Sequence, residues 1–270
     1  MDLSKPKSAI IFGGSGFIGT HLAYELSNQG YSVLIADLVA PLRNSFPFFQ
    51  CDVRKPIDIK ILQTPSLIFN LAAVHRTPGH TPGEYYETNV KGAENVTNWA
   101  SENGIKKIVF TSSISVYGPN NELLDESCTT NPVSDYGKSK LMAEEIHSQW
   151  QSEDSKNRSL VICRPAVVFG PGERGNFTRL AKALKRHYFF YPGGRATQKA
   201  SGYVKDATRS LIFFAEKDTM NILYNFSFPK NYTIGEICDA FCSIAQYANP
   251  ISIPVARIGK ILSTRKGSLG

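Results

Sequence analysis

Two side chains four residues apart, Tyr136 and Lys140, could together carry proton transfer. In a helix this spacing puts both side chains on one face. An ammonium group beside a phenol favours the phenolate, which gives a general base that works near neutral pH. The chain holds 12 tyrosines, so a Tyr-x-x-x-Lys spacing arises by chance about once. The position of the pair in the fold must therefore decide its meaning.

A run of hydroxyl side chains precedes this pair. Residues 107–110 read Lys-Ile-Val-Phe, and Thr111, Ser112 and Ser113 follow them. The apolar run predicts a strand, which places Ser113 at the carboxyl edge of a sheet. There its hydroxyl could hydrogen-bond the same oxygen that Tyr136 serves. For an isolated serine, a turn or a helix cap is the simpler interpretation.

Glycines at positions 13, 16 and 19 form a G-x-x-G-x-x-G pattern near the start of the chain. The pattern follows a predicted strand, residues 8–12, and opens a predicted helix, residues 17–28. Such glycines permit a tight turn and let backbone N–H groups approach a pyrophosphate. This placement predicts a dinucleotide-binding loop made of Gly13, Gly16, Phe17, Ile18 and Gly19.

Asp37 follows the next predicted strand, residues 31–36. It stands near the separation from the glycines at which an acidic side chain accepts hydrogen bonds from ribose hydroxyls. A carboxylate repels a 2′-phosphate, and the next two residues supply no cation, so we expect NAD in preference to NADP. Arg43 is the nearest cation that could weaken this preference, and a turn or helix-cap aspartate is the simpler alternative.

The elements that must position these side chains alternate along the first part of the chain. Strands are expected at residues 8–12, 31–36, 48–51, 67–71, 107–112 and 160–163, with helices at residues 17–28, 84–101 and 135–150. Alternation of this kind predicts an α/β fold with a Rossmann-like, doubly wound parallel sheet. Because the strands are apolar on both sides, we expect helices to cover both faces.

The pattern breaks into shorter pieces after residue 165, where Gly and Pro recur. Helices are expected at residues 177–185, 205–215 and 233–245, and a strand at residues 222–226. We therefore expect residues 1–165 to form the cofactor-binding domain. Residues 166–270 should form a small substrate-binding lobe at the carboxyl edge of the sheet, with a soft boundary across which segments can return to the first domain.

The composition excludes several other classes of protein. The 270 residues hold 30 Lys and Arg against 23 Asp and Glu, a net charge of +7, and 42% hydrophobic residues, as a globular domain does. No apolar stretch approaches the roughly 20 residues of a spanning helix, and the N-terminal apolar run is too short for a signal segment, so we expect a cytoplasmic protein. The five cysteines form no C-x-x-C pair, which favours reduced thiols and no metal.

The positive charge raises the question of an acidic partner. Lys and Arg occur along the chain in runs of no more than two. No aromatic and basic cluster resembles a stacking platform for bases, so we expect no nucleic acid, and we expect no membrane insertion. A small molecule that bears a diphosphate explains the charge as well as any other partner.

In their order along the chain, these motifs resemble those of the extended short-chain dehydrogenase/reductases, within the NAD-dependent nucleotide-sugar epimerase/dehydratase family. The resemblance spans residues 8–245. Further matching segments are Cys51-Asp52-Val53, Asn70-Leu71-Ala72-Ala73, Thr88-Asn89-Val90, Ser115-Val116-Tyr117-Gly118, Arg164-Pro165, Phe169-Gly170-Pro171-Gly172 and Tyr203-Val204-Lys205-Asp206.

The resemblance implies roles for particular residues. It implies a catalytic group made of Ser113, Tyr136 and Lys140. Beyond the glycine loop and Asp37, it implies cofactor contacts from Asp52, Val53, Leu71, Ala72, Ala73, Asn89, Tyr136, Lys140 and Pro165.

The same resemblance implies oxidation at a sugar hydroxyl of a nucleotide sugar. Tyr136 would take the hydroxyl proton while hydride passes to the nicotinamide, with Ser113 on the oxygen and Lys140 on the nicotinamide ribose. The expected reaction is 4-epimerisation through a keto sugar. A 4-keto reductase of a deoxysugar nucleotide is the alternative, and an NAD-binding sensor without turnover is a more distant one.

One reaction within the family is disfavoured. Related 4,6-dehydratases carry an Asp-Glu pair directly after the catalytic hydroxyl residue, for acid and base steps at C6 and C5. This chain has Ile114 and Ser115 there, and neither side chain can act as a carboxylic acid or a carboxylate. We therefore expect that it is not a 4,6-dehydratase.

Departures from the family pattern concern the substrate. Where many relatives have an Asn that contacts the nucleotide diphosphate, this chain has Ala166-Val167, which leaves Asn176 as the nearest candidate. Arg195 and Lys199 could pair with the diphosphate, and a solvated basic loop is an equal alternative.

A second departure lies after the fourth predicted strand. Asn70 stands where His is more usual, and residues 75–80 form an unusual loop that could touch the sugar or cover the site. His75 in this loop is a poor candidate for the base beside Tyr136.

The resemblance also bears on assembly and length. In relatives, two helices, here residues 84–101 and 135–150, pair across a dimer, so we expect a homodimer. Apolar surface for it could come from Val90, Ala93, Val96, Ala100 and Met142, although packing on the sheet explains these residues equally well. Family members commonly exceed about 300 residues, so we expect the second lobe to be short or cut off.

Overall fold

The computed structural model describes residues 7–43, 45–61, 63–75, 79–120, 122–191 and 194–250. They fall into two compact units. Unit one consists of Met1–Val168 and Gly202–Phe226, and unit two of Phe169–Ser201 and Ser227–Gly270. The chain thus returns to unit one for a helix and a strand that the sequence places in the second lobe.

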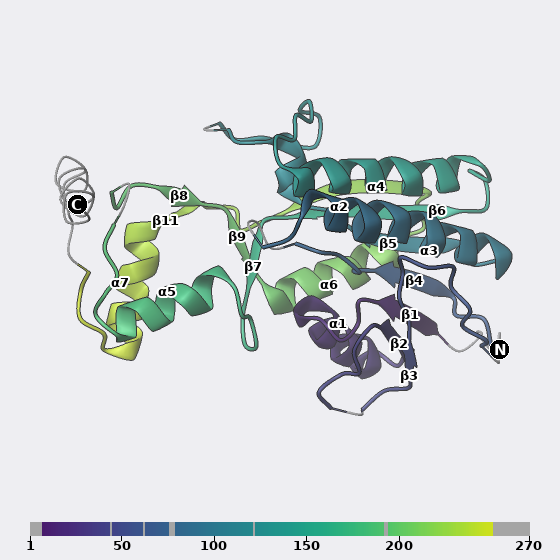
Figure 1. Cartoon of the computed structure of the whole chain (residues 1–270), viewed down its shortest axis with the longest axis horizontal. Coiled ribbons are helices and arrows are strands. Elements are labelled where there is room, and N and C mark those ends of the chain that lie inside the picture. Colours follow the sequence, from purple (N-terminus) through teal and green to yellow (C-terminus); the bar gives the residue numbers. More distant parts are fainter. Residues whose placement is uncertain are drawn as a thin grey trace, which may run out of the picture. The chain divides into compact units, whose positions relative to one another are not determined.

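Unit one is built on a parallel sheet of seven strands in the order β10-β6-β5-β4-β1-β2-β3. The strands from β1 to β6 are labelled in Figure 1. The strands are β1 (Ser8–Phe12), β2 (Ser32–Asp37), β3 (Phe48–Gln50), β4 (Leu67–Asn70), β5 (Lys107–Thr111), β6 (Ser159–Pro165) and β10 (Asn221–Phe226). β1 pairs with β2 on one side and with β4 on the other. The strand order reverses between β1 and β4, which is where ligands bind in sheets of this kind.

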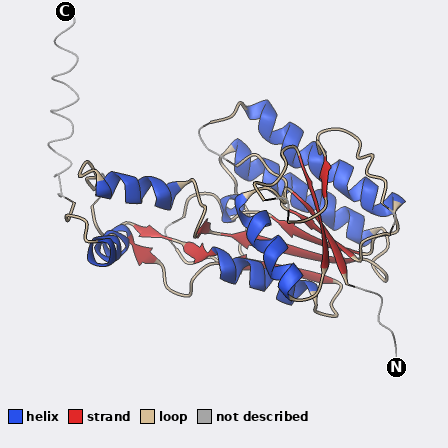
Figure 2. Cartoon of the chain, turned by 90° about the horizontal axis from the view of Figure 1, so that it is seen from below, coloured by secondary structure: helices blue, strands red, loops and turns tan. Residues whose placement is uncertain are grey.

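Helices cover both faces of this sheet (Figure 2). They are α1 (Phe17–Asn28), α3 (Lys91–Glu102), α4 (Asp135–Ser152) and α6 (Val204–Ala215). α3 and α4 pack on one face, and α1 and α6 pack on the other. On the first face the Trp99 ring lies edge-on to the Phe12 ring, with the ring centres 5.6 Å apart. The doubly wound sheet predicted from alternating apolar strands is confirmed.

The predicted helix at residues 84–101 consists of three pieces. A short helix, α2 (Pro82–Tyr85), is followed by a π-helical turn, Tyr86–Val90, and then by α3. The side chain of Glu84 accepts hydrogen bonds from the backbone and hydroxyl of Thr81, and α2 starts two residues earlier than expected. The π-helical turn shifts the helical register by a residue, so residues before and after it do not share one continuous face.

Three of the apolar residues considered for a dimer surface lie in the core. Ala93, Val96 and Ala100 belong to α3 and are buried on the side of that helix that packs on the sheet. Met142 on α4 is exposed. The alternative of packing on the sheet is therefore correct for these three positions, and they offer no surface to a partner.

Unit two has a small core of its own between α5 (Asn176–Lys185) and α7 (Ile234–Ala245). Its buried residues are Leu184, Tyr191, Cys238 and Cys242. The remaining short strands pair as β7 (Val167–Phe169) with β9 (Ser201–Tyr203), and as β8 (Gln198–Lys199) with β11 (Tyr232–Thr233). The two cysteines one turn apart on α7 act as small buried side chains.

The structure of the described residues also bears on metal binding and on membrane spanning. Within the described ranges, no cluster of three or more His, Cys, Asp or Glu is arranged to hold a metal ion. No helix among the described residues is both long and apolar enough to cross a membrane.

Candidate active site

The glycine loop follows β1, and at two of its positions only glycine fits. Gly13 has φ = 77°, and a Cβ there would lie 2.7 Å from the backbone nitrogen of Ala72 after β4. A Cβ on Gly19 would lie 2.5 Å from the carbonyl oxygen of Gly13. Gly16 is the N-cap of α1. The loop, the start of α1 and the end of β4 therefore touch through backbone alone, as a cradle for a pyrophosphate requires.

Two polar groups at this loop fit a bound dinucleotide. The carboxylate of Asp37, at the end of β2, accepts a hydrogen bond of 3.0 Å from the backbone N–H of Ser15. The Ser15 hydroxyl is buried, and no described residue hydrogen-bonds it. A buried hydroxyl without a partner at the mouth of a glycine loop suits a phosphate oxygen.

The other predicted cofactor residues follow the carboxyl ends of neighbouring strands. After β3, Asp52 is held by Arg54 through two hydrogen bonds of 2.8 Å, which lower the pKa of its carboxyl group. Val53 is buried and packs where Gly92 of α3 leaves room. After β4, the Leu71 N–H donates to the Phe12 carbonyl at 2.8 Å. Ala73 follows in the same loop, and Pro165 ends β6.

Asn89, in the π-helical turn, is buried and its side chain has partners within the protein. Its side-chain oxygen accepts the Val74 N–H at 2.9 Å. Its side-chain nitrogen donates to the Val74 carbonyl at 3.1 Å and to the Ser139 hydroxyl at 2.9 Å. That hydroxyl donates to the Tyr136 carbonyl at 2.9 Å. Asn89 thus ties the loop after β4 to the first turn of α4. Its predicted contact with the cofactor stays a prediction.

Ser113 and Tyr136 lie together at the carboxyl edge of the sheet. Ser113 follows β5, and its hydroxyl accepts a hydrogen bond of 3.1 Å from the Ser115 N–H. This bond caps a short 3₁₀ turn. Burial raises the pKa of Tyr136, the Ser113 hydrogen bond opposes this rise, and the nearby Tyr85 adds to it. The expected lowering of the Tyr136 pKa by Lys140 therefore does not appear, since burial raises this pKa and the group that lowers it is Ser113.

Lys140 lies one helical turn after Tyr136, with its side chain buried against the sheet. Its ammonium group stands 4.2 Å from the centre of the Phe110 ring, and it hydrogen-bonds no described residue. Burial lowers the pKa of Lys140 to about 7, and the Glu144 carboxylate opposes this shift. Lys140 can therefore change its charge near neutral pH.

Sequence reasoning did not find the partners behind this lysine. The His147 ring, two turns further along α4, stacks on Phe110 at 4.1 Å, and its Nε2 lies 3.2 Å from the amide of Asn70. The other side of that amide accepts the Ala72 N–H at 3.3 Å. A continuous set of contacts thus joins α4 to the strand end that faces the glycine loop.

A buried ion pair lies on the same face of α4. Glu144 accepts two hydrogen bonds from Arg164 of β6, at 2.9 and 2.6 Å, and both side chains are almost fully buried. Arg164 also donates to the Tyr117 hydroxyl at 2.8 Å. The sequence offered one signal for these contacts. Polar residues recur at every turn of one face of the helix, at positions 140, 144 and 147.

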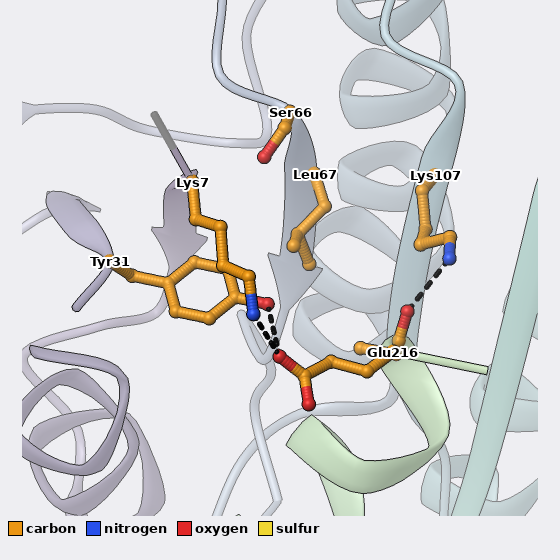
Figure 3. A pocket seen from close by; sticks show the side chains of 7 residues that line it. Lys7, Tyr31, Ser66, Leu67, Lys107 and Glu216 are labelled. Carbon is orange, nitrogen blue, oxygen red and sulfur yellow. Dashed lines mark hydrogen bonds and ion pairs between the residues drawn. The ribbon is translucent and has the colours of Figure 1, made fainter. Parts of the chain in front are cut away.

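A hollow of about 480 Å³ opens at the opposite, amino edge of the sheet (Figure 3). Lys7 and Tyr31 both point to the Glu216 carboxylate, at 2.7 and 3.1 Å, while Lys107 donates to the Ala215 carbonyl at the end of α6. These charged groups are satisfied by one another, which is typical of a structural ion-pair cluster.

The three predicted substrate residues all lie in unit two. Arg195 is engaged there, because it pairs with Asp239 at 2.5 Å and donates to the Tyr191 hydroxyl at 3.0 Å. Asn176 accepts a hydrogen bond from Arg179. Lys199 is exposed on β8. In unit one, His75 is exposed, and residues 76–78 of the predicted loop lie outside the described residues.

This arrangement of a parallel sheet, a glycine loop after β1 and a Tyr-x-x-x-Lys helix defines a Rossmann-type enzyme of the short-chain dehydrogenase/reductase class. The model of the NAD dependent epimerase/dehydratase family matches residues 9–232. The chain belongs to this family.

Three similar proteins illustrate its range. N-acetyl-alpha-D-glucosaminyl-diphospho-ditrans,octacis-undecaprenol 4-epimerase of Escherichia coli O157:H7 is 34% identical over 205 residues, which are 73% of this chain and 60% of that protein. The structure of UDP-N-acetylglucosamine 4-epimerase from Methanobrevibacter ruminantium M1, in complex with UDP-N-acetylmuramic acid, is 25% identical with a TM-score of 0.81, covering 92% of this chain and 85% of that one. TunA, an NAD dependent NDP-hexosamine 5,6-dehydratase, is 26% identical with a TM-score of 0.80, covering 91% and 84%.

Proposed function

We propose that the chain catalyses NAD-dependent 4-epimerisation of a sugar carried on a diphosphate. The observation that carries this proposal is Ser113 at the end of β5 beside Tyr136, with buried Lys140 one turn further along the same helix. The matched part of the E. coli relative is 60% of its length, so the activity of that protein supports the proposal without establishing it here.

The residues at the glycine loop fit the cofactor. Gly13 and Gly19 let the loop, the start of α1 and the end of β4 pack backbone against backbone, and the buried Ser15 hydroxyl is available to hydrogen-bond a phosphate oxygen. The carboxylate of Asp37 suits ribose hydroxyls and disfavours a 2′-phosphate, which supports NAD over NADP. When bound, NAD supplies the acceptor and later the donor of the hydride, and the positive charge of its oxidised ring.

The protein's own groups handle the proton and the oxygen. As the C4–H bond breaks, the phenolate oxygen of Tyr136 takes the proton of the 4-hydroxyl and the C4–O bond becomes a carbonyl. Ser113 donates a hydrogen bond to that oxygen. When the hydride returns to the other face of C4, Tyr136 gives the proton back, so atoms and charge balance over the cycle. Between these steps Tyr136 is a neutral phenol, and the Lys140 ammonium would stabilise its phenolate before the first step and after the second.

Dehydration of the 4,6 type is not part of the proposal. Ile114 and Ser115, which follow Ser113, bring no carboxyl group to the site. The similarity to a 5,6-dehydratase shows that the family fold also serves elimination reactions. These two side chains, and not the fold, therefore disfavour dehydration.

The carrier of the sugar has two candidates. A nucleotide is the expectation from the sequence. A polyprenol is the second candidate, because the relative that is 34% identical acts on a sugar joined through a diphosphate to undecaprenol. A homodimer and a cytoplasmic location stay predictions.

The test is incubation with UDP-glucose, UDP-N-acetylglucosamine and N-acetylglucosaminyl-diphospho-polyprenol, each with NAD. Epimerisation should appear with at least one of them, with no net change in absorbance near 340 nm. Tyr136→Phe should lose at least about a hundredfold in rate, whereas Tyr86→Phe, which removes only a hydroxyl bonded to Asp135, should not. Stoichiometric oxidation of NADH by a keto sugar would instead establish the reductase, and turnover with none of these would favour the sensor.

A further inference from the structure

One segment of unit two carries a dense cluster of positive charge. Residues 174–199 contain seven cations and no carboxylate, and the rest of the chain is balanced, with 23 of each. The seven are Arg174, Arg179, Lys182, Lys185, Arg186, Arg195 and Lys199. A second cationic stretch of the sequence, residues 240–270, holds four cations and no carboxylate.

The helix in this segment, α5, has two different faces. Its apolar side, with Leu180 and Leu184, packs in the core of unit two. Lys182, Lys185 and Arg186 are exposed on the rest of the helix and the turn that ends it, at a spacing of three and four residues that places them close together. None of the three forms an ion pair with a described residue. Their charges are therefore open to an anionic partner.

Two exposed aromatic rings directly follow these cations. From Tyr188 to Tyr191 the side chains alternate, so that Phe189 and Tyr191 contact the core of unit two while Tyr188 and Phe190 stay outside it. Tyr188 is 59% exposed and Phe190 is 42% exposed. Exposed rings cost free energy in water, and a purely solvated basic helix has no need of them.

Cations on one side of an amphipathic helix, with aromatic rings beside them, are the composition of surfaces that bind the interface of a bilayer. The cations attract phospholipid headgroups, and the rings settle among the headgroups and the first methylenes. We propose that Lys182, Lys185, Arg186, Tyr188 and Phe190 form a docking surface for an anionic phospholipid bilayer. The protein would rest on the membrane without spanning it.

This docking deepens the proposed function, and it rests on that function where it bears on the substrate. A sugar joined to a polyprenol stays in the bilayer, so an enzyme that acts on it must work at the membrane surface. A nucleotide sugar is dissolved in water and makes no such demand. The docking surface therefore favours a polyprenol over a nucleotide as the carrier.

The experiment is co-sedimentation of the full chain with vesicles of about 30% phosphatidylglycerol in phosphatidylcholine, at about 0.1 M salt. Each cation near such a surface strengthens binding about fivefold. The triple variant Lys182→Glu, Lys185→Glu, Arg186→Glu should therefore partition at least about a hundredfold more weakly. Reversal of three exposed lysines of unit one, Lys60→Glu, Lys106→Glu and Lys156→Glu, makes the same change in net charge and should weaken binding far less.

A second variant tests the rings without changing the charge. Tyr188→Ser with Phe190→Ser should weaken partitioning about tenfold or more while the thermal unfolding midpoint stays near that of the wild type. Wild-type protein should not sediment with pure phosphatidylcholine vesicles. Equal partitioning of wild type and the unit-two triple variant would overturn the proposal, as would capture by RNA without capture by anionic vesicles.

The outcome is independent of the proposed reaction. Vesicle binding that is lost in the unit-two variants, in a protein that turns over no sugar, would support docking and refute the epimerase. Turnover of a UDP-sugar by wild type and by the unit-two triple variant alike, with no vesicle binding by either, would refute docking and leave the epimerase standing.

Discussion

The side-chain amide of Asn70 lies 3.2 Å from the imidazole Nε2 of His147, both of them buried. The other ring nitrogen, Nδ1, is 2.6 Å from the Ala143 carbonyl, which can only accept a hydrogen bond. Nδ1 therefore carries the proton, and Nε2 accepts from Asn70. Burial lowers the pKa of His147 to about 4, so the ring is neutral at physiological pH. The pair holds the helix of Lys140 to the strand end beside the glycine loop.

Breaking this pair should cost stability in a coupled way. His147→Phe keeps a ring on Phe110 but leaves the Asn70 amide nitrogen unpaired, and Asn70→Leu removes the partner of both the His147 Nε2 and the Ala72 N–H. Each should lower the free energy of unfolding by about 1–3 kcal/mol. The double variant should lose less than the sum, by about 1 kcal/mol or more. Urea unfolding at pH 7 measures all four proteins, and strictly additive losses would show that the contact has no energetic weight.

The buried Lys140 should make stability depend on pH. Its pKa is about 7 in the folded protein, below the ordinary 10.5, so between these pH values the unfolded chain binds more protons. The free energy of unfolding should therefore rise with pH above 7, by about 2 kcal/mol between pH 7 and pH 9. Lys140→Met should lack this rise. Both proteins contain the same buried thiols, so the contribution of these thiols to the pH dependence cancels when the two are compared by chemical denaturation. Parallel curves of stability against pH would contradict a pKa near 7 for Lys140.

The glycine loop offers a test of the cofactor cradle. Gly19→Ala places a methyl group 2.5 Å from the Gly13 carbonyl and should abolish detectable NAD binding in titration calorimetry. Gly83→Ala in α2 is the matched control, because a Cβ there meets nothing within 4 Å and the backbone is helical. Retained NAD affinity in Gly19→Ala would mean that the loop does not hold the pyrophosphate.

Asp37 should set the preference between the two dinucleotides. Asp37→Asn keeps an oxygen for the Ser15 N–H but removes the charge that repels a 2′-phosphate. The ratio of the NADP to the NAD dissociation constant should fall at least about tenfold, which corresponds to about 1.4 kcal/mol. An unchanged ratio would assign the discrimination to another residue.

The sequence is sufficient to predict the sheet because each strand is a short apolar run that ends in a polar or glycine residue. Local patterns do not reveal which later segment completes the sheet, so α6 and β10 are assigned to the second lobe although β10 pairs with β6. The π-helical turn before α3 contains Asn89, whose contact with Val74 no local pattern reveals.

For the site, the local motifs predict Ser113, Tyr136 and Lys140 because their spacing reflects one strand end and one helix face. The residues behind them could not be predicted, since Phe110, Asn70 and Arg164 reach α4 only through pairing of separate strands. The cofactor and substrate contacts of individual residues stay predictions.

The fate of the hydrogen at C4 tests the central claim most directly. A substrate that the enzyme accepts, labelled with deuterium at C4 and incubated with the protein and NAD in ordinary water, is followed by NMR. Because the same hydride leaves and returns while Tyr136 handles only the hydroxyl proton, the epimer should keep its deuterium at C4. Loss of the deuterium to solvent, or its accumulation in reduced cofactor without epimer, would contradict 4-epimerisation by this site.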